Sequence, residues 1–325
     1  MIGAPVAAIV LLTYNQEQFV EEALLSLLNQ DRDDIEIIVS DDCSHDKTWD
    51  RINTVVSQYG GSKRVILSQN KTNLGIVDNY HVAYQRSSAN LIFMAAGDDI
   101  SAPDRCSKCI QFWLDSKEKY DLVAADAIDM AYDGTVLGIK ENDQIEDWDI
   151  DKWFDERPYF FGASHMVTRR LLDLAPLSNQ LPYEDQCLVF RAMLMGGIVR
   201  LPIPLVYHRR GGMTQQPDNF KFAYRKKEII RDFTREVEEL KQFSKDAALL
   251  NMSSALDLII LQRKKYCASI LELFQNPRSI KSLITFWKSS DVPLKDKVRY
   301  SKYFLFYPGL AITHGIRDIL RLIRD

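Results

Sequence analysis

The sequence predicts an α/β fold: a doubly wound, mostly parallel sheet of the Rossmann-like kind, followed by an all-helical C-terminal extension. Strand-like apolar runs and amphipathic helical segments alternate five times between residues 6 and 128, which is typical of a sheet with helices on both faces. Beyond about Pro217 the pattern becomes helical, and one apolar stripe runs from Ile229 to Leu240. We therefore expect a first domain over residues 1–217 and a helical region over 218–325.

The first predicted strand, Val6–Thr13, is an almost continuous apolar run, as expected of a strand buried on both faces. A helix follows it, because Phe19, Ala23 and Leu27 recur at helical spacing. The same reasoning predicts strands at Ile35–Ser40, Val65–Leu67, Leu91–Ala96 and Leu122–Ile128, and helices that carry Trp49 to Val56, that cover Val77–Gln85, and that run from Pro103 through Trp113.

The pattern changes after Asp129. Asp133-Gly134 predicts a hairpin turn, and the acidic, Trp-rich segment 143–157 predicts an irregular or helical excursion. Phe160–Thr168 is expected to form a strand and Asp185–Met195 a helix. The segment Ile198–Leu205 carries two prolines, which favours an edge strand because proline cannot donate a ladder hydrogen bond.

Composition excludes some classes of protein. The net charge of −4 gives no sign of nucleic-acid binding. Five scattered cysteines fit a reducing compartment, and Cys106-x-x-Cys109 is interpreted as two semi-buried helix residues. The first residues do not have the pattern of a signal peptide, and no apolar run reaches the roughly 20 residues that span a bilayer. We expect a cytoplasmic protein, with peripheral contact at the inner face of the cell membrane left open.

Two pairs of carboxylates follow two of the predicted strands. Asp41-Asp42 ends the second strand, and Asp98-Asp99 follows the fourth after Gly97. In an open α/β sheet, ligands bind beyond the carboxyl ends of the strands. Acidic pairs are costly there unless cations or hydrogen-bond donors meet them. A divalent metal that bridges to a phosphorylated ligand is the obvious candidate.

Six short motifs in a fixed order carry a family resemblance. They are Leu12-Thr13-Tyr14-Asn15, Leu28-Asn29-Gln30, Val39-Ser40-Asp41-Asp42-Cys43-Ser44, Asn73-Leu74-Gly75, Gly97-Asp98-Asp99 and Glu184-Asp185. Over roughly residues 6–215 the chain resembles a family 2 glycosyltransferase with the GT-A fold, of the type that builds bacterial surface polysaccharides. The resemblance implies a nucleotide-sugar donor, for which we expect a UDP-sugar, and a glycan or lipid-linked saccharide as the acceptor.

The resemblance assigns the donor nucleotide to the first two strand ends. Tyr14 could stack on the nucleotide or hydrogen-bond to it, whereas Asn15 could equally cap the next helix. A carboxylate accepts hydrogen bonds from a uracil N–H or from ribose hydroxyls, although one aspartate of such a pair can serve the turn instead. The residues implied to contact the nucleotide are Thr13, Tyr14, Asn15, Asp41, Asp42 and Asn73.

The resemblance also implies a metal site. Asp98 and Asp99 would hold Mg²⁺ or Mn²⁺, because hard divalent cations prefer carboxylate oxygens and substrate phosphates. Such an ion would neutralise the departing nucleoside diphosphate. The sequence departs from the common Asp-x-Asp form, since Ala96 stands where the first acid is expected. The alternative is that these residues cap the helix introduced by Pro103, which fits Asp99 or Ser101 but leaves Asp98 unexplained.

Two further motifs complete the implied site. The family places its catalytic base at Asp185, although two acids at a helix start also suit the helix dipole. Because no separate nucleophile is required, the implied reaction is a single displacement that inverts the anomeric centre. The resemblance further implies that His208 and Arg209 reach the diphosphate, aided by the glycines that follow. A basic surface loop is the equal alternative.

The C-terminal residues 293–325 mix basic and aromatic side chains. In the last segment Ile316, Ile319, Leu320 and Ile323 share one helical face. This composition suits an amphipathic helix on an anionic leaflet. It also suits helices that pack on the catalytic domain or on a second subunit, which is the interpretation we favour.

The expected function is therefore metal-assisted, inverting transfer of a hexosyl or N-acetylhexosaminyl group. The main alternative is a degenerate, non-catalytic homologue that binds a nucleotide-sugar, because Ala96 removes one acid. A nucleotidyltransferase would need a glycine-rich basic loop after the first strand, and Thr13-Tyr14-Asn15-Gln16 offers none. A receiver-like domain would need a lysine near the end of the fifth strand, where Ala124-Ala125-Asp126 stands.

Overall fold

The computed structural model of the 325-residue chain describes residues 4–211, 222–276 and 279–305. These fall into two compact units. The first contains the described residues up to 211 together with 245–252, and the second contains 222–244 with the described residues from 253 onward. The predicted boundary at residue 217 lies outside the described residues. Within the described ranges, none of the helices is long and apolar enough to cross a membrane.

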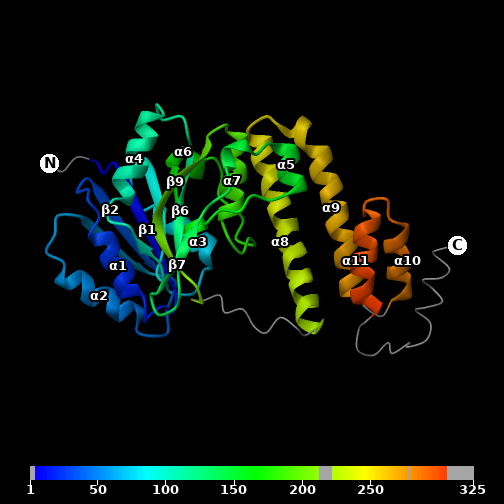
Figure 1. Ribbon diagram of the computed structural model, residues 1–325, viewed down its shortest axis with the longest axis horizontal. Coiled ribbons are helices and arrows are strands. Elements are labelled where there is room, and N and C mark those ends of the chain that lie inside the picture. Colours follow the sequence, from blue (N-terminus) through cyan, green and yellow to red (C-terminus); the bar gives the residue numbers. More distant parts are fainter. Residues whose placement is uncertain (1–3, 212–221, 277–278, 306–325) are drawn as a thin grey trace. The chain divides into compact units, whose positions relative to one another are not determined.

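The first unit is built on one nine-stranded sheet with the order β3-β2-β1-β4-β8-β6-β9-β5, to which β7 adds on β6. Figure 1 labels β1, β2, β6, β7 and β9 of this sheet. Parallel pairs join β1 to β2 and β4, β2 to β3, and β6 to β9, whereas β8 is antiparallel to both β4 and β6. The predicted doubly wound, mostly parallel sheet is confirmed. The strands are β1 (Ala7–Thr13), β2 (Ile35–Asp41), β3 (Arg64–Gln69), β4 (Leu91–Ala96), β5 (Ile100–Ser101), β6 (Leu122–Met130), β7 (Val136–Lys140), β8 (His165–Thr168) and β9 (Ile198–Arg209).

Helices cover both faces of this sheet. Helices α1 (Val20–Leu28), α2 (Thr48–Gln58) and α4 (Arg105–Asp115) pack on one face, where they meet alternate strand residues such as Ile9 and Phe93. Helix α3 (Ile76–Tyr84) contacts β1 and β2. Because successive side chains of a strand point to opposite faces, a sheet covered on both sides makes its strands apolar throughout. Cys106 and Cys109 lie in α4, as predicted, although both are completely buried and not semi-buried.

Two predicted strands differ from the observed ones. Strand β8 begins only at His165, because Gly162–Ser164 form a 3₁₀ turn, η2. Strand β9 is not a free edge: it continues to Arg209, and β5 pairs with its residues Val206 and Tyr207. The prolines of β9 fall where its pairing with β6 is irregular, so they remove no regular ladder bond.

Four short elements surround the second half of the sheet. They are the 3₁₀ turn η1 (Ile145–Asp147), α5 (Ile150–Asp155), α6 (Arg169–Asp173) and α7 (Asp185–Leu194). The excursion predicted over 143–157 is thus η1 followed by α5. Helix α7 is buried on all sides over residues 187–192, where Cys187, Leu188, Val189 and Phe190 are completely buried, so its position in the first unit is fixed by packing.

The second unit is all-helical, as predicted. It contains most of α8 (Phe222–Leu249), with α9 (Ser253–Gln275), α10 (Ile280–Lys288) and α11 (Leu294–Leu305). Edge-to-face aromatic contacts mark its core: the ring centroids of Phe233 and Tyr300 lie 5.9 Å apart, and those of Phe274 and Tyr300 lie 6.0 Å apart. The final amphipathic segment predicted around residues 316–323 lies outside the described residues.

Candidate functional site

The carboxyl ends of the parallel strands meet at one edge of the sheet. Thr13 of β1 lies in register with Asp41 of β2, and Leu12 lies in register with Ala96 of β4. The loops that follow these strands therefore start side by side, and the end of β9 reaches the same edge through β6 and β5. This is the edge at which open α/β sheets bind ligands.

Asp41 is completely buried at this edge. Its carboxylate accepts hydrogen bonds from Thr13 Oγ1 (3.0 Å), from the Ser44 backbone N–H (3.0 Å) and from Gln69 Nε2 (3.1 Å). The Asp41 carboxylate thus connects the ends of β1, β2 and β3 through buried hydrogen bonds, one of them from Thr13. Direct contact of either side chain with a nucleotide stays a prediction.

Asp42 holds the loop that precedes α3. Its two carboxylate oxygens accept hydrogen bonds from the backbone N–H groups of Leu74 (2.8 Å) and Gly75 (2.9 Å) and from Asn70 Nδ2 (2.9 Å). Gly75 has φ = 82°, a conformation that favours glycine. Asn73 is exposed on this loop, so the Asp42 carboxylate fixes the position of a side chain predicted to bind the nucleotide.

Asn15 connects the loops after β1 and β2. Its backbone N–H donates to Ser44 Oγ (2.9 Å), and its side-chain oxygen accepts from the His45 N–H (2.8 Å). The alternative that Asn15 caps the next helix is wrong, because α1 begins only at Val20. Tyr14 is half-buried between these tied positions, and its contact with a nucleotide stays a prediction.

The second acidic pair divides into one surface and one buried carboxylate. Asp98 is partly exposed, whereas Asp99 is buried and accepts a hydrogen bond from the Arg209 backbone N–H at 3.0 Å. Burial, with the neighbouring charge of Asp98, raises the pKa of Asp99 well above its ordinary value. Asp99 therefore links the loop after β4 to β9, and its role as a metal ligand stays a prediction.

Arg209 requires a correction, because its side chain points into the protein and is only 4 % exposed. The guanidinium donates to Glu22 Oε2 of α1 (2.7 Å) and to the backbone oxygens of Tyr132 (2.9 Å) and Asp98 (3.2 Å). It also lies 4.6 Å from the centre of the Phe19 ring. The cause is the alternation of side chains along a strand, which sends His208 and Arg210 to the other face.

His208 and Arg210 share the carboxylate of Asp129 on that face. His208 Nδ1 lies 3.2 Å from Asp129 Oδ1, and Arg210 Nε donates to Asp129 Oδ2 at 3.1 Å. Burial, reinforced by the charge of Lys140, lowers the pKa of His208, against the opposing effect of Asp129 and Asp98. The ring is therefore neutral at neutral pH. With Nδ1–H directed at Asp129, its lone pair is on Nε2.

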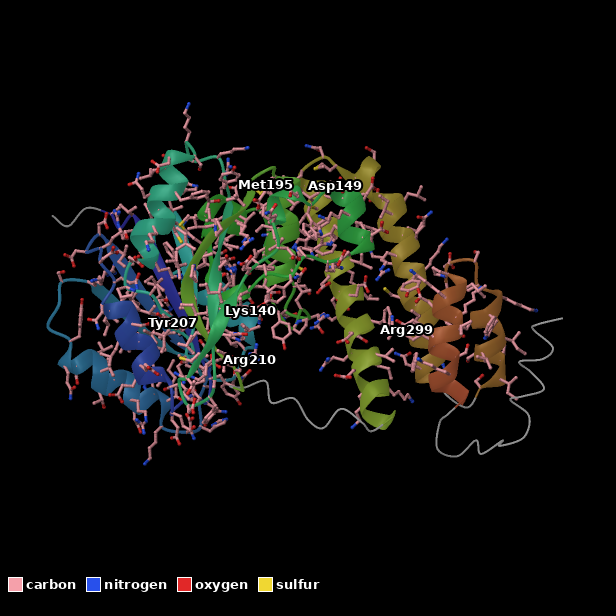
Figure 2. The ribbon with its side chains drawn as sticks, viewed as in Figure 1. Lys140, Asp149, Met195, Tyr207, Arg210 and Arg299 are labelled. Carbon is pink, nitrogen blue, oxygen red and sulfur yellow. The ribbon has the colours of Figure 1, made fainter. Side chains whose placement is uncertain are left out.

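Lys140, at the end of β7, adds a second cation beside this group. Figure 2 labels Lys140 and Arg210 near the same end of the sheet, and both charges act on Asp129. Lys140 Nζ lies 4.9 Å from the centre of the Tyr159 ring. The side chain of Arg210 is 61 % exposed, in contrast to 4 % for Arg209.

Asp185 stands at the first position of α7. Its carboxylate is partly buried, and Oδ1 accepts a hydrogen bond from the Gln186 N–H at 2.6 Å. Gly162 of η2 lies so close that a β-carbon there would be 3.1 Å from Asp185 Oδ2. Burial and the charge of Asp185 raise the pKa of the adjacent Glu184 to about 8. At neutral pH Glu184 therefore keeps its proton beside Asp185.

Several members of this group were not predicted from the sequence: Asp129, Lys140, Tyr159 and Arg210. One signal was available, because an alternating strand cannot direct both His208 and Arg209 to the same side. The others depend on pairing between segments distant in sequence, which no local pattern reveals.

The donor groups at this edge suit a hard divalent cation that arrives with a phosphorylated ligand. Within the described residues, no group of three or more His, Cys, Asp or Glu side chains is arranged to hold a metal alone. Asp98 offers a carboxylate, and its negative charge acts to raise the pKa of His208. The Nε2 atom of His208 carries a lone pair. Mg²⁺ needs only one or two protein ligands when phosphate oxygens supply the rest.

Comparison with known sequences gives a family. The model for glycosyl transferase family 2 matches residues 8–174, which is just over half of the chain. The abequosyltransferase RfbV of Salmonella typhimurium is 32 % identical over 107 residues, 32 % of this chain and 31 % of RfbV. The chain likewise spans less than half of the length of similar glycosyltransferases from Haemophilus influenzae and Bacillus subtilis.

Comparison with solved structures supports the fold. TarS 1–349 of S. aureus in complex with UDP superposes with a TM-score of 0.55 at 16 % identity, over 92 % of this chain and 80 % of TarS. The mannosyltransferase PcManGT of Pyrobaculum calidifontis, in complex with GDP-Man and Mn²⁺, gives a TM-score of 0.53 at 15 % identity, over 98 % of this chain and 86 % of PcManGT. The sheet, the order of the motifs and the match over residues 8–174 lead to one conclusion: the chain belongs to glycosyl transferase family 2.

Proposed function

We propose that this protein transfers a sugar from a nucleotide-sugar, in the first place a UDP-sugar, to a hydroxyl of a glycan or lipid-linked saccharide, with inversion at the anomeric carbon. One observation carries the proposal. In a family 2 chain, the carboxyl edge of the sheet gathers Asp98, His208 and Arg210, while α7 presents the carboxylate of Asp185 beside a Glu184 whose pKa is raised.

The donor is proposed to lie along this edge. Tyr14, Asn15 and Asn73 stand on the loops that Asp41, Asp42 and Thr13 hold in place, so the first three are the contacts and the others position them. Arg210, with His208, replaces Arg209 as the group that meets the diphosphate, because its guanidinium is exposed. TarS is described in complex with UDP and PcManGT in complex with GDP-Man, which supports a nucleotide-sugar as the donor.

A divalent cation fits the site, and Asp98 with His208 Nε2 would hold it. When bound, Mg²⁺ or Mn²⁺ supplies positive charge that neutralises the departing nucleoside diphosphate. PcManGT is described with Mn²⁺, which supports the proposal. Asp99 contributes by joining this loop to β9 through the Arg209 N–H.

Asp185 is the proposed general base. It removes the proton of the acceptor hydroxyl while the acceptor oxygen bonds to the anomeric carbon. The bond from that carbon to the phosphate oxygen breaks in the same step, and the nucleoside diphosphate leaves with the electron pair. A single attack from the opposite side inverts the configuration, and no covalent enzyme intermediate forms.

The first experiment tests donor binding and turnover together. Calorimetry with UDP, GDP, CDP and dTDP, each with and without Mn²⁺ or Mg²⁺, identifies the base and the dependence on metal. Release of nucleoside diphosphate from the matching nucleotide-sugars then reports transfer or donor hydrolysis. Binding without any release of product would favour the non-catalytic homologue, and no binding of any diphosphate would refute a donor site.

The base assignment has its own variant. Asp185→Asn keeps the size of the side chain but cannot accept a proton, so transfer should fall by about two to four orders of magnitude with little change in UDP affinity. Asp115→Asn, on an exposed position of α4, is the matched control. Normal turnover by Asp185→Asn would refute Asp185 as the base.

Contact with a membrane is proposed for the second unit, on its surface alone. Ile280 and Ile284 of α10, and Leu294 and Val298 of α11, are exposed apolar residues one turn apart. Residues 279–305 carry six basic and two acidic side chains, although the chain as a whole is acidic. Exposed apolar residues among lysines suit an anionic lipid surface, which would bring the site to a lipid-linked acceptor.

Co-sedimentation with vesicles tests this contact. Binding to anionic vesicles at low salt should weaken in the double variant Ile284→Asp, Val298→Asp, and Leu258→Asp on α9 is the control for an exposed apolar residue elsewhere. No binding by the unaltered chain would refute the contact, and equal binding by the double variant would refute this surface.

A further inference from the structure

A short turn contacts two of the proposed functional side chains at once. The ring of Phe161 lies 4.4 Å from the ring of His208, centroid to centroid, and the planes are tilted by 43°. The next residue, Gly162, faces Asp185: a β-carbon at position 162 would lie 3.1 Å from Asp185 Oδ2 and 3.2 Å from its Cβ. Because Phe161 and Gly162 are adjacent, one peptide bond connects the residue that contacts His208 with the residue that faces Asp185.

We propose that Phe161 and Gly162 are positioning residues, which hold the imidazole of His208 and the carboxylate of Asp185 in the arrangement that transfer requires. This inference rests on the proposed function and deepens it. Phe161 acts through its ring, and Gly162 acts through its missing side chain.

The glycine is explained by this contact and not by its backbone. Gly162 is not among the residues with positive φ, so alanine could adopt the same conformation without strain. The two distances to Asp185 are shorter than the 3.5–4.0 Å at which carbon atoms normally pack. Any side chain at position 162 would therefore displace the carboxylate.

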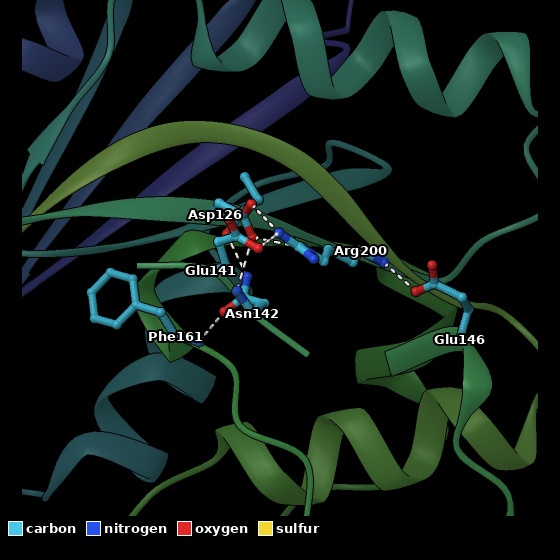
Figure 3. Close-up of polar contacts among 7 residues, drawn as sticks. Asp126, Glu141, Asn142, Glu146, Phe161 and Arg200 are labelled. Atoms are coloured by element: carbon cyan, nitrogen blue, oxygen red, sulfur yellow. Dashed lines mark hydrogen bonds and ion pairs between the residues drawn. The ribbon is translucent and has the colours of Figure 1, made fainter. Parts of the chain in front are cut away.

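The turn is held from the sheet side by Asn142. The Asn142 side-chain oxygen accepts the Phe161 backbone N–H at 2.7 Å, and its Nδ2 donates to the Ala125 carbonyl of β6 at 2.6 Å. The Asn142 backbone N–H donates to Asp126 Oδ1 at 2.9 Å. Figure 3 shows this amide between Phe161 and Asp126. A buried asparagine with three such bonds leaves the turn little freedom.

Arg200 of β9 fixes Asp126 in turn. Its Nε and Nη2 donate to the two oxygens of Asp126 at 2.9 and 2.6 Å, a bidentate pair, and Nη2 also meets Glu141 at 2.9 Å. The Arg200 backbone N–H donates to Glu146 Oε2 at 2.9 Å, as Figure 3 shows. These bonds connect residues 141–146 to β6 and β9. The η2 turn, which comes later in the chain, is thereby anchored to the sheet.

Arg105 also holds the turn in place. This buried side chain donates from Nη2 to the carbonyl of Ala163 at 2.9 Å and to that of Met94 in β4 at 2.7 Å. The turn is therefore linked to β4, β6 and β9, the strands whose ends carry Asp98, Asp129 and His208. The side chains that must act together on one substrate are therefore positioned by the same sheet and the same turn.

Gly162→Ala is the decisive variant, and Gly60→Ala is its matched control, because a β-carbon at Gly60 has no neighbour within 4 Å. A base displaced by about 1 Å costs turnover about a hundredfold, and a β-carbon at position 162 requires the Asp185 carboxylate to move by a few tenths of an ångström. We expect kcat of Gly162→Ala to fall by about threefold or more, with the KM for donor, the UDP affinity and the melting temperature close to wild type. A wild-type kcat in Gly162→Ala would overturn the proposal. So would a lower kcat that is accompanied by weaker UDP binding and a lower melting temperature, because that pattern indicates general damage to the fold.

Phe161→Leu gives a readout that needs no turnover. NMR of the His208 imidazole reports its contacts with neighbouring protons, and loss of the Phe161 ring, whose centroid lies 4.4 Å away, should change the contacts of the imidazole with the rest of the site. Unchanged contacts with the rest of the site would overturn the role of Phe161. Absence of transfer by the wild-type protein would instead refute the proposed function, and the imidazole contacts would still decide whether Phe161 positions the ring.

Discussion

Arg209 Nη2 donates to Glu22 Oε2 at 2.7 Å, so the last residue of β9 is tied to α1 on the side of the sheet away from His208. The adjacent Arg210 reaches the other side, where it pairs with Asp129. Two neighbouring arginines with the same chemistry thus have different tasks, one structural and one at the candidate site.

This division predicts opposite results for two alanine variants. Arg209→Ala removes three hydrogen bonds from a guanidinium that is almost completely buried. Its free energy of unfolding in urea should fall by about 2–3 kcal/mol, with UDP affinity retained in the folded protein. Arg210→Ala should weaken UDP binding by about tenfold, the effect of one charge-assisted bond, with little loss of stability. Calorimetry on both variants checks the assignment, and the reverse pattern would contradict it.

Asp42 provides a second test of structural support. Asp42→Asn keeps the shape but leaves one acceptor oxygen where the carboxylate serves Leu74, Gly75 and Asn70 with two. An unmade buried bond costs about 1–3 kcal/mol, so the free energy of unfolding should fall by that amount and the loop with Asn73 should bind nucleotide less tightly. The exposed Asp50→Asn, on α2, is the control and should change stability by less than about 0.5 kcal/mol. Equal stability of the two variants would refute the role of Asp42.

Glu184 predicts a pH dependence of stability. Its pKa in the folded protein is about 8, above the ordinary value of 4.5, because it is buried beside the charge of Asp185. Between these values the unfolded chain releases the proton and the folded chain keeps it. The contribution is therefore full below pH 4.5 and is lost as the pH rises toward 8.

Glu184→Gln removes this dependence, since an amide does not titrate. The stability of the variant relative to wild type should increase from pH 5.5 to 7.5, by at most about 1.4 kcal/mol for each pH unit. Urea unfolding at both pH values measures the difference. A constant difference between the two proteins would show that Glu184 titrates at its ordinary pKa.

Much of the fold could be predicted because its signals are local. The runs around Ile9, Ile37 and Phe93 are apolar on both faces, which identifies central strands without any knowledge of their partners. The positions of Asp41 and Asp98 at strand ends follow from the same boundaries. The shared edge then follows from the parallel direction of the strands.

The parts that could not be predicted depend on pairing across the chain. The side to which Arg209 points is set by the register of β9 on β6, and the partners of Asn142 are a turn and a strand up to 19 residues away. The burial of Asp99 depends on the Arg209 N–H, 110 residues later. Sequence motifs indicated which residue types are at the site, whereas non-local packing decides which of them face a ligand.

Ala96 allows the metal assignment to be tested by gain of function. It is partly exposed at the end of β4, two residues before Asp98, where the common family motif has its first acid. Ala96→Asp should tighten Mn²⁺ binding in the presence of UDP, by about tenfold for one added carboxylate ligand. The neutral Ala96→Asn has nearly the same size and should leave the affinity unchanged.

The same variant should also make thermal stability depend on metal. Without Mn²⁺ the added charge lies near Asp98, and repulsion between like charges should lower the melting temperature of Ala96→Asp below that of Ala96→Asn. Addition of Mn²⁺ with UDP should reverse this order, because a ligand that binds only the folded state stabilises it. If Mn²⁺ raised neither the UDP affinity nor the melting temperature of Ala96→Asp above those of Ala96→Asn, Asp98 would not be a metal ligand. Its carboxylate would then meet the donor without a cation, as the loss of the first acid would suggest.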